Sequence, residues 1–72
     1  MIRELTPTQR GAYLTLMLMR GRRIEIEAEA RAMGVTPRTV ERTLERISLI
    51  VPIDEAERGV WVPVGTDVPV IQ

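Results

Sequence analysis

The amino-acid sequence predicts an α+β domain that is mainly helical, with three helices, one short strand and a C-terminal β-hairpin. Three observations support this fold class. Apolar residues recur at helical spacing in residues 7–19, 27–33 and 37–47. Residues that cap or terminate helices lie at the ends of these segments. Two β-branched runs, 49–53 and 60–64, flank a polar loop that ends in glycine.

The first helix is expected to run from Pro7 to about Met19. Thr6 can cap it with its hydroxyl, and Gln9 can reach back to complete a capping box. Pro7 suits the first helical position, where its missing N–H costs nothing. Gly11 lowers helix stability by about 1 kcal/mol relative to alanine, which suggests close packing at this position.

Apolar residues are denser in residues 12–19 than one amphipathic stripe requires. We expect Leu14, Met17 and Leu18 to form the core stripe, with Tyr13 and Leu16 toward one edge. The surplus has two interpretations. A very small domain can simply wrap its first helix, or the helix can present an apolar surface to a partner or to a second copy.

A short strand and a second helix follow. Ile24 and Ile26 flank Glu25, and this alternation is typical of a very short strand. The second helix is expected over residues 27–33. Gly34 should end it, because glycine readily takes the left-handed conformation found at helix C-termini.

The third helix is expected over residues 37–47. Thr36 can cap it and Pro37 suits its first position. Val40, Leu44 and Ile47 are spaced by four and three residues, so they share one face. A second face carries three arginines: Arg38, Arg42 and Arg46.

The two β-branched runs are expected to form a hairpin around the polar loop 54–59. Pro52 and Pro63 should lie at edges or at positions without a ladder hydrogen bond. Trp61, the only tryptophan, is expected to pack the hairpin onto the helices.

The length of 72 residues allows one domain, which we expect over residues 1–65, followed by an extended tail, 66–72. Pro69 in the tail is incompatible with a central strand. No apolar stretch approaches the ~20 residues of a membrane span, and the N-terminus lacks the apolar run of a signal peptide. The sequence therefore predicts a soluble, cytoplasmic protein.

Residues 25–47 resemble the helix-turn-helix motif. The small residue of the first helix, the turn glycine, the apolar plug, the capping hydroxyl and two inward positions of the recognition helix match Ala30, Gly34, Val35, Thr36, Val40 and Leu44. Together with the short strand and the hairpin, the order of elements is similar to that of winged helix-turn-helix transcription regulators. The resemblance implies that helix 37–47 is a recognition helix and that the hairpin is a wing.

The composition argues against catalysis. The chain has no cysteine and no histidine, so it lacks a thiol nucleophile, the usual proton shuttle and the usual soft metal ligands. It also shows no nucleophile–base pair and no phosphate-binding loop. Glu25, Glu27 and Glu29 are spaced by two residues, which does not bring side chains together on a helix. We expect no enzyme activity, no cofactor and no metal site.

The charge distribution bears on the partner. Ten arginines balance ten acidic residues, so the formal net charge is zero, whereas DNA-binding domains usually show a basic footprint. Residues 20–46 carry seven arginines against five glutamates, and residues 47–72 carry one arginine against four acidic residues. The expected wing is therefore acidic and would repel a phosphate backbone.

Two functional hypotheses follow. The chain looks like the small phage-encoded regulators that bind host RNA polymerase, and residues 9–14 are similar to the first helix of winged domains in phage replication proteins. The resemblance to the polymerase-binding regulators implies that the chain binds a polymerase subunit and inhibits or redirects transcription through protein contacts. The neutral charge and the acidic hairpin favour this hypothesis.

The alternative is a winged-helix repressor or excisionase-like protein that binds DNA as a dimer. Arg38 or Arg42 could then contact guanine, and Glu41 could accept a hydrogen bond from cytosine. Other arginines could meet phosphates. For either partner, the candidate contact residues are Arg22, Arg23, Thr36, Arg38, Thr39, Glu41, Arg42, Arg46 and Arg58.

Overall fold

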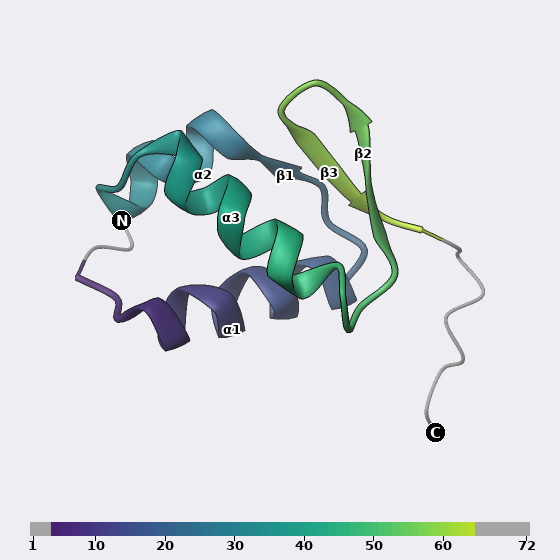
Figure 1. Cartoon of the computed structure of the whole chain (residues 1–72), viewed down its shortest axis with the longest axis horizontal. Coiled ribbons are helices and arrows are strands. Elements are labelled where there is room, and N and C mark those ends of the chain that lie inside the picture. Colours follow the sequence, from purple (N-terminus) through teal and green to yellow (C-terminus); the bar gives the residue numbers. More distant parts are fainter. Residues whose placement is uncertain (1–3, 65–72) are drawn as a thin grey trace.

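Three helices on one side and a small antiparallel sheet on the other make up the part of the chain that the computed structural model describes, residues 4–64 (Figure 1). The elements follow in the order α1 (Pro7–Met19), β1 (Ile24–Glu25), α2 (Ile26–Met33), α3 (Pro37–Ile47), β2 (Ile53–Glu57) and β3 (Val60–Pro63). The strand order is β1-β3-β2. This is the predicted α+β class, and the topology is that of a winged helix. Residues 1–3 and the expected tail, 66–72, lie outside the described residues.

The core is built almost entirely from helices and the strand between them. Val40, Leu44 and Ile47 form the buried face of α3, as their spacing predicts. Leu14 and Leu18 form the buried stripe of α1. The full set of buried side chains is Leu14, Leu18, Ile24, Ile26, Ala30, Met33, Val40, Leu44, Ile47 and Ile53. Half-buried Tyr13, Met17, Val35, Val51 and Trp61 pack against it.

The predicted helix caps are confirmed. The Thr6 hydroxyl accepts from the Gln9 N–H at 3.1 Å, and the Gln9 side chain accepts from the Thr6 N–H at 2.9 Å, which completes the capping box. Gly34 ends α2 in the left-handed conformation, with φ 70°. Thr36 caps α3 by accepting from the Thr39 N–H at 3.3 Å.

The start of α2 differs slightly from the prediction. The strand is limited to Ile24 and Glu25, and the helix already begins at Ile26. Glu25 makes no side-chain capping bond. Instead, the Ile26 N–H donates to the carbonyl of Gly59, at the hairpin turn, over 2.9 Å. A distant part of the chain thus satisfies a backbone donor that a helix start leaves unpaired.

The prediction that residues 49–53 form the first strand of the hairpin was wrong. Residues 49–51 do not pair in the sheet, because their N–H groups donate back to carbonyls at the end of α3 and so turn the chain. The strand is formed by Ile53–Glu57, the acidic stretch that was expected to be a loop. A two-residue turn, Arg58 and Gly59, joins it to β3. Gly59 has φ 81°, which glycine adopts without strain.

The sheet places the two prolines and the tryptophan as expected. Pro63 is paired with Ile53 of β2. On the edge of β3 that faces β1, the pairing involves only Val60 and Trp61, so Pro63 interrupts no hydrogen bond with β1. Pro52 precedes β2 and accepts a hydrogen bond from the Val64 N–H at 2.8 Å. Trp61 is half-buried and packs the hairpin against the core.

Candidate functional site

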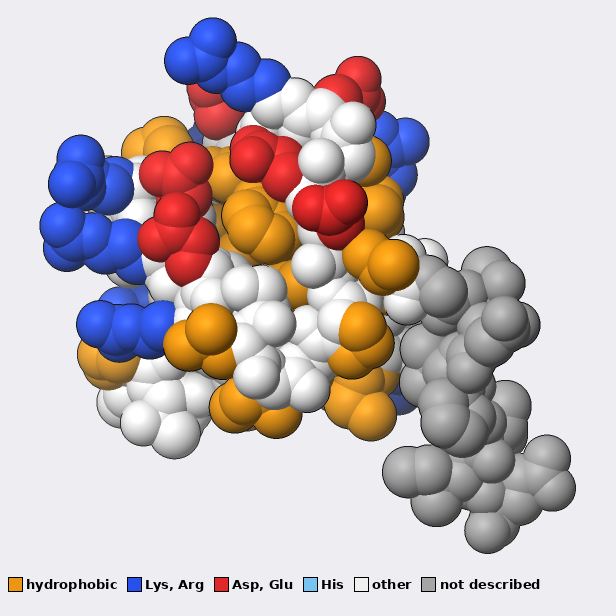
Figure 2. Space-filling view, turned by 45° about the vertical axis from the view of Figure 1, so that its right-hand side comes forward, with side chains coloured by type: hydrophobic (Ala, Val, Ile, Leu, Met, Phe, Trp, Pro, Cys, Tyr) orange, Lys and Arg blue, Asp and Glu red, His pale blue; other side chains and the backbone are white. Residues whose placement is uncertain are grey.

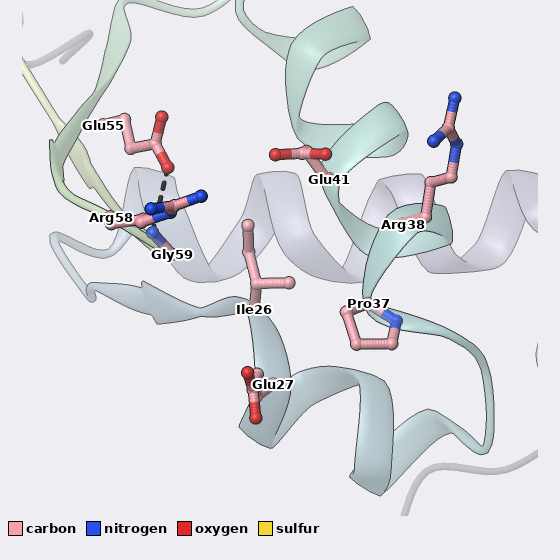
Figure 3. Close-up of a pocket in the computed structure, with 8 residues that line it drawn as sticks. All are labelled: Ile26, Glu27, Pro37, Arg38, Glu41, Glu55, Arg58 and Gly59. Atoms are coloured by element: carbon pink, nitrogen blue, oxygen red, sulfur yellow. Dashed lines mark hydrogen bonds between the residues drawn. The ribbon is translucent and has the colours of Figure 1, made fainter.

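An open groove lies between the first turns of α2 and α3 and the hairpin (Figure 3). Its volume is about 600 Å³. We call it the α3–hairpin groove, and it is lined by Ile26, Glu27, Pro37, Arg38, Glu41, Glu55, Arg58 and Gly59. It separates α3 from the hairpin, so a molecule that contacts both must also cross the groove.

Local folding places each wall of the groove. The Thr36 cap fixes the start of α3, so Arg38 and Glu41 lie about one turn apart on its exposed surface. On the hairpin, Glu55 lies two residues after the buried Ile53 and therefore faces the same side of the sheet, toward the helices. Its carboxylate accepts from the Gly59 N–H at 2.9 Å, which holds it over the turn.

The groove combines an apolar floor with charged walls. Ile26 is buried and forms the floor, and the Pro37 ring lies beside it (Figure 3). Glu41 and Glu55 extend toward one another from opposite walls, whereas Arg38 points away from the groove centre. Within residues 4–64 the single ion pair joins Arg23 and Glu57 at 3.0 Å, outside this lining. Among the described residues, therefore, no arginine lies within ion-pair distance of the three lining glutamates.

The structure brings together three of the nine predicted contact residues: Arg38, Glu41 and Arg58 line the groove. Arg42 and Arg46 are exposed on α3 but do not line it. The remaining four residues also lie outside the groove lining. The hydroxyls of Thr36 and Thr39 bond one another at 3.0 Å in the cap of α3, Arg23 pairs with Glu57, and Arg22 is exposed in the turn after α1.

The prediction missed Glu27 and Glu55, which supply two of the three carboxylates of the groove. Glu27 was considered only as a member of a metal or catalytic cluster and excluded on its spacing, and Glu55 was assigned to a loop. One sequence signal could have placed Glu55 on the helix side of the hairpin. Glu55 follows the apolar Ile53 by two residues, and residues at this spacing lie on the same face of a strand.

Charges of both signs share the surface around the groove. Figure 2 shows arginine side chains at the left, top and right edges of the view, with acidic side chains between them around exposed hydrophobic atoms. Arg38 and Arg58 line the groove together with three glutamates, so carboxylates outnumber arginines in the lining by three to two.

A second titratable cluster lies outside the groove, on α1 and α2. Burial, followed by repulsion from Glu25, raises the pKa of Glu29 above its ordinary value. Burial, followed by the charge of Glu29, raises the pKa of Tyr13. One carboxylate oxygen of Glu29 is shielded from solvent and has no hydrogen-bond partner within residues 4–64.

Within residues 4–64, no set of three or more acidic, histidine or cysteine side chains could hold a metal ion. None of the described helices has the length and apolar character that crossing a bilayer requires. Comparisons with known protein families, with curated protein sequences and with solved structures found no match to this chain.

Proposed function

We propose that this chain is a small transcription regulator that docks on bacterial RNA polymerase and inhibits or redirects transcription through protein contacts. The observation that carries the proposal is the pair of carboxylates, Glu41 and Glu55, that face one another across the α3–hairpin groove. They lie where a winged helix that reads DNA needs neutral or basic groups.

The hairpin adds to this argument. Its strand β2 carries Asp54, Glu55 and Glu57, all exposed, against Arg58 in the turn. The nearby Arg23 is already paired with Glu57. Because non-specific DNA affinity comes almost wholly from phosphate neutralisation, a wing of this charge contributes little to it.

The groove has the properties of a protein-binding surface. It offers an apolar floor, Ile26 and Pro37, surrounded by side chains of both charges. Protein interfaces combine an apolar centre with a polar rim, and complementary charges on the rim fix the partner and the orientation. The resemblance to phage regulators supplies the expectation that the partner is a polymerase subunit in the cytoplasm of a host bacterium.

Affinity capture from a bacterial lysate tests the proposal, with polymerase subunits identified by mass spectrometry. Wild type should retain polymerase. The charge reversal Glu41→Arg should weaken retention strongly, whereas Glu45→Arg, on the same helix but outside the groove, should leave it nearly unchanged. Recovery of no polymerase subunit, or equal loss in both variants, would contradict docking through the groove.

A second candidate function rests on a different observation. Arg38 and Arg42 are exposed one turn apart on α3, and Arg58 lies in the turn of the hairpin. This arrangement favours a DNA-binding repressor or excisionase-like protein in which α3 enters the major groove.

Titration of random duplex DNA at several salt concentrations separates the two functions. The docking proposal predicts weak binding with a shallow salt dependence, because few phosphates are neutralised. Tight binding with a steep salt dependence, abolished by Arg42→Glu in a folded variant, would establish the DNA-binding function instead.

A further inference from the structure

Two carboxylates face the interior of the α3–hairpin groove from opposite walls. Glu41 extends from α3 and Glu55 from the hairpin, toward one another (Figure 3). Glu55 uses one oxygen, Oε2, to accept from the Gly59 N–H, which fixes its position and leaves Oε1 for another donor. Neither carboxylate forms an ion pair within residues 4–64. Two negative groups that face the same space favour a positive group between them.

The floor below these carboxylates selects the kind of cation. Ile26 is 5% exposed and lies between the two walls, with the Pro37 ring beside it (Figure 3). The acidic side chains of the described chain form no metal site, so a cation that serves both walls has to be a larger organic group. An arginine side chain matches the whole lining, because its methylene stem packs on apolar surface while its planar guanidinium donates to carboxylates on more than one side.

The hairpin wall of the groove offers side chains and not backbone groups. The Gly59 N–H donates to Glu55, and the Gly59 carbonyl accepts from the Ile26 N–H at 2.9 Å. On the opposite wall, Pro37 has no N–H to offer. Main-chain pairing of the kind that adds a peptide strand to a sheet is therefore not available at this turn, so a bound partner is recognised through its side chains.

The two arginines of the lining, Arg38 and Arg58, would instead suit an acidic side chain. Arg38, however, points away from the groove centre (Figure 3). Arg58 lies on the same wall as Glu55, and carboxylates outnumber the two arginines because Glu27 also lines the groove. An aspartate or glutamate side chain would also bring a shorter apolar stem to the floor. The balance of these features favours a cationic occupant, and binding of an acidic one is the competing outcome of the test.

We propose that the α3–hairpin groove binds one arginine side chain of the partner protein, with its guanidinium between Glu41 and Glu55 and its methylene stem on Ile26 and Pro37. The inference rests on the proposed docking function, since it names the group of the partner that the groove takes. The volume of about 600 Å³ lies within the range of sites that hold a small organic group. Arginine is also among the residues that most often dominate the binding energy of a protein interface.

NMR titration of the isotopically labelled full chain with N-acetylarginine amide tests this inference without polymerase. The amide signals of the groove residues should shift and saturate, with a dissociation constant on the order of 1 mM. N-acetylcitrulline amide has nearly the same shape without the charge and should bind about tenfold more weakly. The lysine and glutamate amides should also bind more weakly than the arginine amide, because one lacks the planar fork and the other has the wrong charge.

Neutral variants identify the carboxylates involved. Glu41→Gln and Glu55→Gln should each weaken binding of the arginine amide about threefold. Glutamine at position 55 keeps an oxygen that can accept from the Gly59 N–H, so the turn is retained. The matched control is Glu45→Gln, which removes an exposed carboxylate of α3 outside the groove and should leave binding unchanged.

The inference is overturned if the citrulline, lysine or glutamate amide binds as tightly as the arginine amide, or if neither groove variant weakens binding. These outcomes are separate from those of the polymerase capture. Polymerase retained by the groove without binding of the arginine amide would refute the arginine site alone. Binding of the arginine amide without any retained polymerase would refute the docking function and leave the arginine site standing.

Discussion

The helical body and the hairpin of this protein are held in place by different interactions. The body, from α1 through α3, supplies nine of the ten buried side chains of the core, and the hairpin supplies only Ile53. The hairpin is fixed instead by its ladder with β1, by Trp61 and by the hydrogen bonds at its turn. Substitution of the buried side chains in the body should therefore destabilise the fold. The exposed charged residues of the hairpin should tolerate substitution with little effect on folding.

Truncation of one core residue in each region should give the largest contrast. Leu44 is fully buried among the helices, and Ile53 is 8% exposed at the start of the hairpin. We expect Leu44→Ala to lower the free energy of unfolding by about 3 kcal/mol or more, and Ile53→Ala to lower it by about half as much. Urea denaturation measures both. Equal losses would show that the hairpin is as much a part of the core as α3.

The turn of the hairpin should be the next most sensitive position. Gly59 has φ 81°, and a Cβ there would meet no neighbour within 4 Å, so only backbone strain opposes alanine. Gly59→Ala should destabilise the protein by about 1–2 kcal/mol. Trp61 fluorescence would reveal whether the hairpin loosens before the helices unfold. Unchanged stability would mean that the turn readily adopts another conformation.

The corresponding substitution in the body should have the opposite sign. Gly11 lies within α1, and a Cβ there would meet only the Thr43 methyl, at 3.9 Å, which is an ordinary contact. We expect Gly11→Ala to stabilise the protein by about 0.5–1 kcal/mol, because alanine is the better helix former. Thermal unfolding monitored by circular dichroism would detect the gain, and a loss would indicate a tighter approach of α1 to α3.

The smallest effect should be a pH dependence located in the body. Folding raises the pKa of Glu29, so the folded state binds this proton more tightly than the unfolded state does. Stability should therefore fall as pH rises from about 4.3, the ordinary glutamate pKa, through the raised value in the folded state. Glu29→Gln removes this loss and should be slightly more stable than wild type at neutral pH. The two proteins should converge in acid, and a difference that stays constant with pH would exclude this cause.

The sequence predicted the body well because its signals are local. Side-chain caps such as Thr6 and Thr36 act within three residues, and the spacing of Val40, Leu44 and Ile47 needs no knowledge of the rest of the chain. The prediction of close packing at Gly11 was wrong, because a Cβ there would meet only the Thr43 methyl at 3.9 Å, and no neighbour requires glycine.

The hairpin was harder to predict because tertiary contacts determine it. Residues 49–51 have high β propensity, yet their N–H groups complete the end of α3. The acidic residues of β2 have low β propensity, yet they pair with β3 because Ile53 anchors the strand and Gly59 closes the turn. The lining of the groove was hard to predict for the same reason. Arg38 and Glu41 could be predicted from α3 alone, but Glu55 joins them only once the hairpin is placed.

The bond between the Ile26 N–H and the Gly59 carbonyl has a consequence for measurement. The two residues are far apart in sequence, and this amide is protected from solvent only while the wing stays against the helices. Its hydrogen-exchange rate therefore reports how often the wing swings away, independently of global unfolding, which the amides inside α3 record. A ligand bound between the hairpin and the helices would slow this exchange, together with that of the neighbouring β1–β3 pairs.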